Sequence, residues 1–146
     1  MSVRTFVFVF FIVSVSSMCA EDIDWPRLIW AVGQVESAGD TFAYNKKEKA
    51  YGLLQCRQGV VTDLNQTYHM GLRLEDLYSP AVSAWAFKHY GLRYKARTAE
   101  QFVRIWNAGP DGHRQSCSLA YWYRVRALYT KTKTRGWYPT WFSVNS

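Results

Sequence analysis

Apolar side chains recur every three or four residues in four stretches of the chain, which is the period of an amphipathic helix. These stretches predict helices over residues 25–38, 79–91, 98–106 and 118–131, with Ser118 placed to cap the last one. The inward positions of that last helix are Tyr121, Trp122, Val125 and Leu128.

Local signals support two of the helix starts. Asp24 is a plausible N-cap for the first helix, Pro26 suits its first turn, and Gly39 follows its predicted end. Thr98 and Gln101 have the spacing of a capping box before the third helix.

The intervening segments are rich in turn residues. Residues 40–61 read as a loop or short β-hairpin packed beside the first helix, a short helix starts within 59–64, and 107–114 form a loop. There are no internal repeats. The pattern predicts a single, mainly α domain with a small β or loop region.

The N-terminus has the pattern of a secretory signal peptide. Arg4 is followed by an apolar run over 6–15 and by small residues that offer a cleavage site after Ala20. The run is about half the ~20 residues that a membrane-spanning helix needs. Cleavage predicts an exported domain over 21–146, periplasmic or extracellular; an uncleaved anchor and lipoprotein processing at Cys19 are the alternatives. An aromatic tail, from about residue 132, contains Trp137, Tyr138, Trp141 and Phe142.

The chain is basic. Its 18 Lys and Arg against 11 Asp and Glu give a net charge of +7, and loss of residues 1–20 removes only Arg4 from this count. A basic exported protein favours anionic partners such as wall polymers, phospholipid surfaces or polyanions, although the charge also serves solubility. We expect no nucleic-acid partner, because the chain has an export signal and no nucleic-acid-binding motif.

Glu36 is the strongest candidate for chemistry. Ile29, Val32 and Glu36 are spaced i, i+3 and i+7 and share one face of the first predicted helix. A carboxyl group beside an apolar face loses hydration, so its acid form persists closer to neutral pH. That is the property of a general acid. The alternative is a solvated surface residue at a helix end.

Four short motifs follow one another along the chain: Glu36-Ser37, then Gly52-Leu53-Leu54-Gln55, then Asn107-Ala108-Gly109, then Tyr121 at the start of the last helix. In this order they resemble the lysozyme-like lytic transglycosylases of the soluble type, over about residues 25–129. Leu54 stands where the family more often has Met, and Trp106 where it has Tyr. Cys56 occupies a position that is commonly aliphatic.

The resemblance implies a lysozyme-like α+β fold and a peptidoglycan lytic transglycosylase. Such an enzyme cleaves the MurNAc–GlcNAc β-1,4 bond with a single Glu, here Glu36, as acid and then base, and leaves 1,6-anhydro-muramoyl ends. It also implies that Tyr121 orients Glu36. The substrate-binding residues that it implies are Ser37, Gly52, Leu53, Gln55, Asn107 and Tyr121. Ordinary structural roles are the alternative for each.

A second catalytic carboxylate would point instead to a lysozyme-type hydrolase. The candidates are Asp40, Asp63 and Asp111, and each has a structural explanation as a helix-end cap, a hydrogen-bond partner or a turn residue. The sequence therefore favours the transglycosylase over the hydrolase. A non-enzymatic wall-glycan-binding module is the rival of another class, and the presence of Glu36 argues against it.

Cys56 and Cys117 would remain after signal cleavage, and an even pair in an exported protein could form a disulfide if both flanking motifs line one cleft. Two buried free thiols are the alternative. His69, His89 and His113 match no metal-ligand spacing, so we expect neither metal nor cofactor. We expect a monomer.

Overall fold

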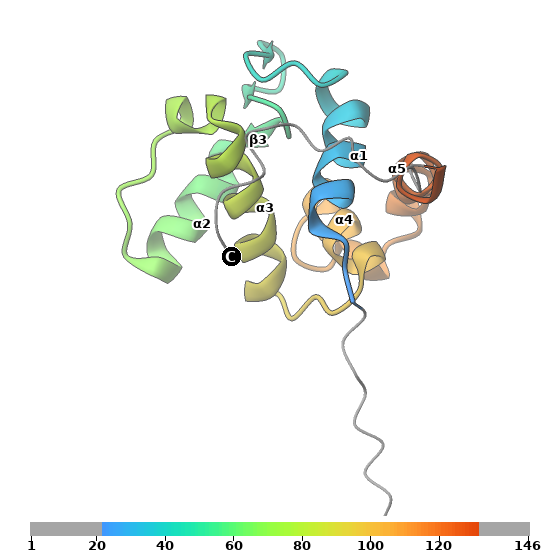
Figure 1. Cartoon of the computed structure of the whole chain (residues 1–146). Coiled ribbons are helices and arrows are strands. Elements are labelled where there is room, and N and C mark those ends of the chain that lie inside the picture. The colour runs from blue at the N-terminus through green and yellow to red at the C-terminus, as the bar shows by residue number, and fades with distance from the viewer. Residues whose placement is uncertain (1–21, 132–146) are drawn as a thin grey trace, which may run out of the picture.

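A computed structural model describes residues 22–131 (Figure 1). Helices dominate this part of the chain, as the sequence predicted. The five α-helices are α1 (Trp25–Ser37), α2 (Gln58–Tyr68), α3 (Pro80–Arg93), α4 (Ala99–Ala108) and α5 (Leu119–Lys131). Three 3-10 helices connect them, namely η1 (Leu74–Tyr78), η2 (Gly112–Arg114) and η3 (Ser116–Ser118).

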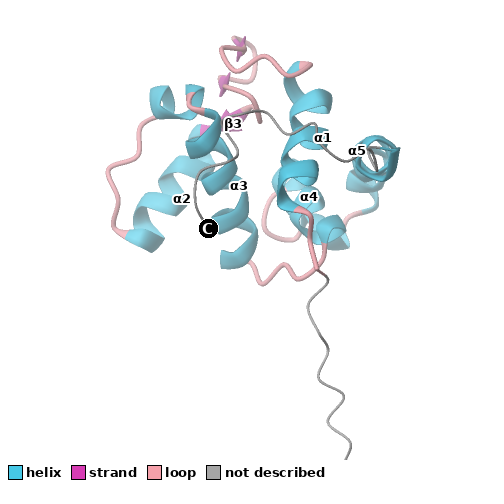
Figure 2. Ribbon diagram, viewed as in Figure 1, coloured by secondary structure: helices cyan, strands magenta, loops and turns pink. Residues whose placement is uncertain are grey.

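A small antiparallel sheet lies between the end of α1 and the start of α2 (Figure 2). Its strands β1 (Tyr44–Asn45), β2 (Ala50–Tyr51) and β3 (Cys56–Arg57) pair in chain order. The sequence predicted a loop or hairpin here, and the third strand is an addition. Asn45 pairs with Ala50, which pairs with Arg57, so these three side chains share one face of the sheet.

The helices pack around one apolar core. In Figure 1, α2 and α3 lie on one side of α1, and α5 lies on the other. Helix α1 packs against α5, and α4 packs against both α3 and α5. The largest fully buried apolar side chains are Leu28, Ile29, Leu54, Leu64, Leu77, Phe87 and Ile105. This packing holds the end of α1 beside the start of α5.

The predicted caps form at α1 and α4. The Asp24 carboxylate accepts a hydrogen bond from the Arg27 amide at 3.2 Å, and the Thr98 hydroxyl accepts one from the Gln101 amide at 3.2 Å. The reciprocal half of the capping box is shifted by one residue, because the Gln101 side chain accepts from the Arg97 amide at 2.7 Å. Both helices therefore begin where local sequence places them.

Three helix boundaries differ from the prediction by two residues or more. Helix α2 runs on to Tyr68, and α4 ends at Ala108 rather than 106. Helix α3 continues through Gly91 to Arg93, so reading Gly91 as a helix end was wrong. A Cβ atom at this position would lie 2.1 Å from Phe102 Cδ1, so the glycine is required by the packing of α3 on α4.

The predicted signal peptide (residues 1–20) and the aromatic tail from about 132 lie outside the described residues. Within 22–131, none of the helices combines the length and apolar character that a membrane crossing requires.

Candidate active site

A cleft of about 630 Å³ opens where α1, the sheet, α4 and α5 converge. Four of the residues predicted from the sequence line it: Glu36, Gln55, Asn107 and Tyr121. The cleft also contains residues that sequence reasoning did not select, among them Asn45, Glu48, Arg57, Tyr90 and Arg124.

Glu36 is the penultimate residue of α1, and its carboxyl group faces this cleft. Burial raises the pKa of Glu36, and the charge of Glu48 adds to this rise. The hydrogen bond from Tyr121 and the charges of Arg57 and Arg124 lower the pKa. The effect of burial is the largest, so the pKa lies above the ordinary value for glutamate. Glu36 therefore keeps its proton to a higher pH than a solvated glutamate, as a general acid requires.

Tyr121 holds this carboxyl group in place. Its side chain is 4% exposed, and its hydroxyl donates a hydrogen bond of 2.5 Å to Glu36 Oε1. Burial, with the neighbouring Glu36, raises the pKa of the Tyr121 phenol well above its usual range, so it stays a neutral donor. The arrangement matches the orienting role that the resemblance implied.

Ser37 and Leu53 form a structural contact behind the cleft. The Ser37 hydroxyl donates to the Leu53 carbonyl at 2.8 Å, and neither residue lines the cleft. The Leu53 side chain is buried, and a Cβ atom on Gly33 would lie 2.8 Å from Leu53 Cδ1. In the structure both residues join α1 to the turn at 52–55, and their contact with substrate stays a prediction.

Gly52 also lies outside the cleft lining. Its φ of +74° belongs to the left-handed region, and a Cβ atom there would lie 2.0 Å from the Leu77 carbonyl oxygen. The close backbone approach expected at this glycine exists, with η1 as its partner in the structure, and an approach to a sugar stays a prediction.

Gln55 and Trp106 complete this side of the cleft. The Gln55 side-chain amide donates to the Gly52 carbonyl at 2.9 Å and to the Ala43 carbonyl at 3.3 Å. The Trp106 indole donates to the Leu54 carbonyl at 2.9 Å, which joins α4 to the same turn. Asn107 follows directly and lines the cleft.

The cleft contains a second carboxylate, Glu48, which sequence reasoning missed. It lies between β1 and β2 and forms an ion pair of 2.5 Å with Arg57. Asn45 and Arg57 share a sheet face, so recognising three strands would have grouped these two residues, which line the cleft together with Glu36. Strands of two residues show no alternation that could reveal them.

The three aspartates considered as second acids lie elsewhere, since none lines the cleft. Asp40 accepts from the Phe42 amide at 2.9 Å, and Asp63 accepts from Arg93 Nε at 3.0 Å and the Tyr94 hydroxyl at 2.5 Å. Asp111 precedes η2. Asp63 has the structural hydrogen bonds that the sequence predicted, whereas Asp40 bonds the turn that follows α1 and does not cap the helix.

The predicted disulfide is absent, which corrects that prediction. Cys56 and Cys117 are both free thiols. Cys56 is buried on β3, and burial raises its pKa to about 12, whereas Cys117 is exposed on η3 with its Sγ 3.5 Å from Gln115 Oε1. One thiol lies in the core and the other at the surface. No group of His, Cys, Asp or Glu within 22–131 has the arrangement of a metal site.

Comparison with known families gives this site its class. The transglycosylase SLT domain family matches residues 17–126, which is most of the chain. The chain therefore belongs to the SLT transglycosylase family, and its activity is of the lytic transglycosylase type on peptidoglycan. Searches of curated proteins and of solved structures found no match.

Proposed function

We propose that this protein is an exported lytic transglycosylase that cleaves the MurNAc–GlcNAc β-1,4 bond of peptidoglycan with Glu36 alone as acid and base. The observation that supports this best is the shielded Glu36 carboxyl group, hydrogen-bonded by Tyr121 and facing a cleft in an SLT domain. Export rests on the signal-like residues 1–20, and the basic charge suits an anionic wall polymer as partner.

The reaction needs no water. Glu36 transfers its proton to the glycosidic oxygen as the bond from that oxygen to C1 of the muramoyl residue breaks. The 6-hydroxyl of the same sugar attacks C1 and returns its proton to the Glu36 carboxylate. Because this nucleophile is part of the substrate, it has a high effective concentration. The products are a free 4-hydroxyl and a 1,6-anhydro-muramoyl end.

A lysozyme-type hydrolase is the second candidate, because Glu48 shares the cleft with Glu36. A hydrolase needs such a carboxylate as base or nucleophile. Glu48 Oε2 is engaged in an ion pair with Arg57 at 2.5 Å, so this oxygen is not free to activate water or attack a sugar. We therefore favour the transglycosylase.

Mass spectrometry of products from purified peptidoglycan distinguishes the two reactions, because an anhydro end is lighter than a reducing end by one water. We expect anhydro products from the wild type. Hydrated muropeptides as the main product would refute the transglycosylase and favour the hydrolase.

Glu48→Gln tests the role of the second carboxylate. We expect anhydro products at a rate within about fivefold of wild type, since a general base would contribute 10²- to 10⁴-fold. The alkaline limb of the pH–rate profile should move to lower pH, because the charge of Glu48 raises the pKa of Glu36. A rate loss above about a hundredfold in a folded variant would instead make Glu48 catalytic.

Arg124→Gln tests whether the cleft recognises an anionic strand. Arg124 lines the cleft with its guanidinium over the Tyr121 ring, and none of the salt bridges in the described part of the chain includes it. It is therefore suited to carboxylates on the peptide stems of peptidoglycan. We expect KM to rise about three- to tenfold at low salt, and the effect to shrink at high salt.

Arg126→Gln is the matched control, because Arg126 is an exposed arginine on the same helix that does not line the cleft. Its KM should equal that of the wild type. An equal rise in KM for Arg124→Gln and Arg126→Gln would show that only the net charge of the protein matters.

A further inference from the structure

We propose that Arg104 is a positioning residue for the reaction proposed above: through Ser118 it sets the start of α5, and with it the hydrogen bond from Tyr121 to Glu36. Arg104 itself does not line the cleft. It rests on the proposed function for its purpose, but its geometry can be tested without catalysis.

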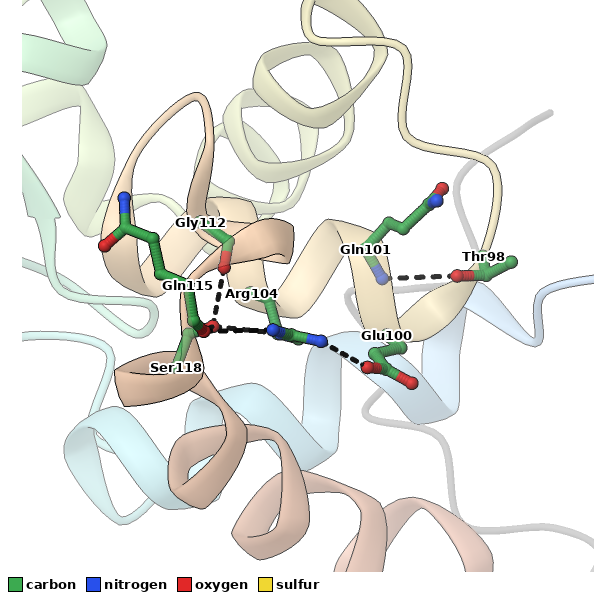
Figure 3. Close-up of polar contacts among 7 residues, drawn as sticks. All are labelled: Thr98, Glu100, Gln101, Arg104, Gly112, Gln115 and Ser118. Carbon is green, nitrogen blue, oxygen red and sulfur yellow. Dashed lines mark hydrogen bonds and ion pairs between the residues drawn. The ribbon is translucent and has the colours of Figure 1, made fainter.

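Arg104 is a buried arginine on α4, 8% exposed. Its guanidinium donates to Glu100 Oε1 at 2.6 Å, to Ser118 Oγ at 2.9 Å and to the Gln115 carbonyl at 3.0 Å (Figure 3). A buried charge is unfavourable unless such partners satisfy it. Two of the three partners lie in the segment that leads into α5, so the guanidinium ties α4 to this segment.

Ser118 extends the contact. It is fully buried, and its oxygen lies 2.6 Å from the Gly112 carbonyl and 2.8 Å from the Gln115 carbonyl, to which its hydroxyl can donate. In Figure 3, dashed lines join Ser118 to both Arg104 and Gly112. The sequence placed Ser118 as a cap for the last helix; its position before α5 is right, but its hydroxyl bonds the preceding turns instead.

Gly112 brings the same segment against α4. A Cβ atom there would lie 2.1 Å from the Arg104 carbonyl oxygen, so η2 contacts the helix backbone directly. The segment 109–118 is thus held at the backbone of α4 and at the end of the Arg104 side chain. This double attachment restricts where α5 can begin.

The start of α5 decides where Tyr121 points. Ser118 directly precedes α5, and Tyr121 follows it by three residues, or roughly 4.5 Å along a helix axis. The Tyr121 hydroxyl is the hydrogen-bond partner of Glu36 Oε1, and that bond lowers the pKa of Glu36. A small shift of α5 would lengthen this bond because hydrogen bonds weaken steeply with distance and angle.

Lengthening the hydrogen bond from Tyr121 should change the pKa of Glu36 in one direction only. A weaker bond from Tyr121 removes an influence that lowers the pKa of Glu36, so this pKa rises further. Glu36 must be protonated to act as acid, so the alkaline limb of the pH–rate profile moves to higher pH while the rate at the optimum falls. A purely structural role for Arg104 would lower stability and leave this limb in place.

The experiment measures the Glu36 carboxyl directly, by ¹³C NMR titration of its side chain in the full chain, together with kcat/KM against pH on purified peptidoglycan. Ser118→Ala removes the hydroxyl that joins Arg104 to the turns, and Tyr121→Phe removes the bond to Glu36. We expect both to raise the Glu36 pKa and move the alkaline limb upward, with kcat/KM at least fivefold lower. In the Tyr121→Phe background, Ser118→Ala should add no further shift.

Glu100→Gln is the control, since it weakens only the contact with Glu100, whose side chain is 41% exposed. It should leave the Glu36 pKa unchanged. Arg104→Lys is the second variant should Ser118→Ala fail to fold, because lysine keeps the charge but has no guanidinium fork. A folded variant with a wild-type Glu36 titration would overturn the positioning role. If the variants shift the Glu36 titration but the wild type cleaves no peptidoglycan, the positioning role stands and only the proposed function is overturned.

Discussion

Glu36→Gln should abolish cleavage of peptidoglycan, with a rate loss of about 10³-fold or more, since general acid–base catalysis alone contributes 10²- to 10⁴-fold and one residue serves both proton transfers. Glutamine keeps the shape of the side chain and an oxygen that can accept from Tyr121. It has no proton that titrates. Release of muropeptides from purified sacculi measures the loss.

The same substitution should not harm the fold, and the pH dependence of Tm checks this. Burial raises the pKa of folded Glu36. The folded state therefore binds the proton more tightly than the unfolded chain, and stability falls as pH rises from the unfolded pKa through the folded one. Glu36→Gln removes this fall, so its Tm should match or exceed that of wild type at neutral pH.

Glu75→Gln supplies the control, because Glu75 is exposed and does not line the cleft. It should retain full activity. A folded Glu36→Gln protein with wild-type rates would show that the acid lies elsewhere in the cleft, with Glu48 the next residue to test.

The sequence alone predicted the starts of α1 and α4 and the desolvated carboxyl group of Glu36. Asp24 and Thr98 mark helix starts through hydrogen bonds that close within three residues, and both form. The apolar face before Glu36 predicted a desolvated carboxyl group, and its pKa is raised by burial. The caps depend on near neighbours, and the apolar period marks which face of a helix turns inward, so a one-dimensional pattern contains both signals.

Contacts between distant segments were not predictable in this way. The bond from Ser37 to Leu53 and the close approach of Gly52 to Leu77 depend on how the sheet sits against α1 and η1. The ion pair of Glu48 with Arg57 depends on a strand register that two-residue strands do not reveal. The disulfide prediction failed for the same reason: nearness to two motifs did not determine which way each thiol faces.

The turn over residues 52–55 therefore serves the site as a support. It receives the Ser37 hydroxyl at Leu53 and the Trp106 indole at Leu54, and it ends in Gln55, which lines the cleft. Through these contacts it aligns the end of α1 with the end of α4. Disturbing the turn should move Glu36 and Asn107 relative to one another.

Gly52→Ala should be the most damaging small substitution in this support, destabilising the fold by roughly 3 kcal/mol through steric overlap and a left-handed backbone. The added methyl would lie 2.0 Å from the Leu77 carbonyl oxygen, and the φ of +74° is unfavourable for alanine. A loss of this size lowers Tm by about 10 °C or more in a domain of this length. Because the turn supports both cleft walls, activity should also fall at temperatures where the variant is still folded.

Gly59→Ala is the matched control, since nothing lies within 4 Å of a Cβ atom at this position in α2. Alanine reduces the freedom of the unfolded chain, so this variant should be more stable than wild type by about 0.4 to 1 kcal/mol. Differential scanning calorimetry of the pair separates steric overlap from a general effect of adding a methyl group. Equal Tm values for the two variants would mean that η1 yields to the methyl group, and the turn would then be a less rigid support for Glu36 than its contacts indicate.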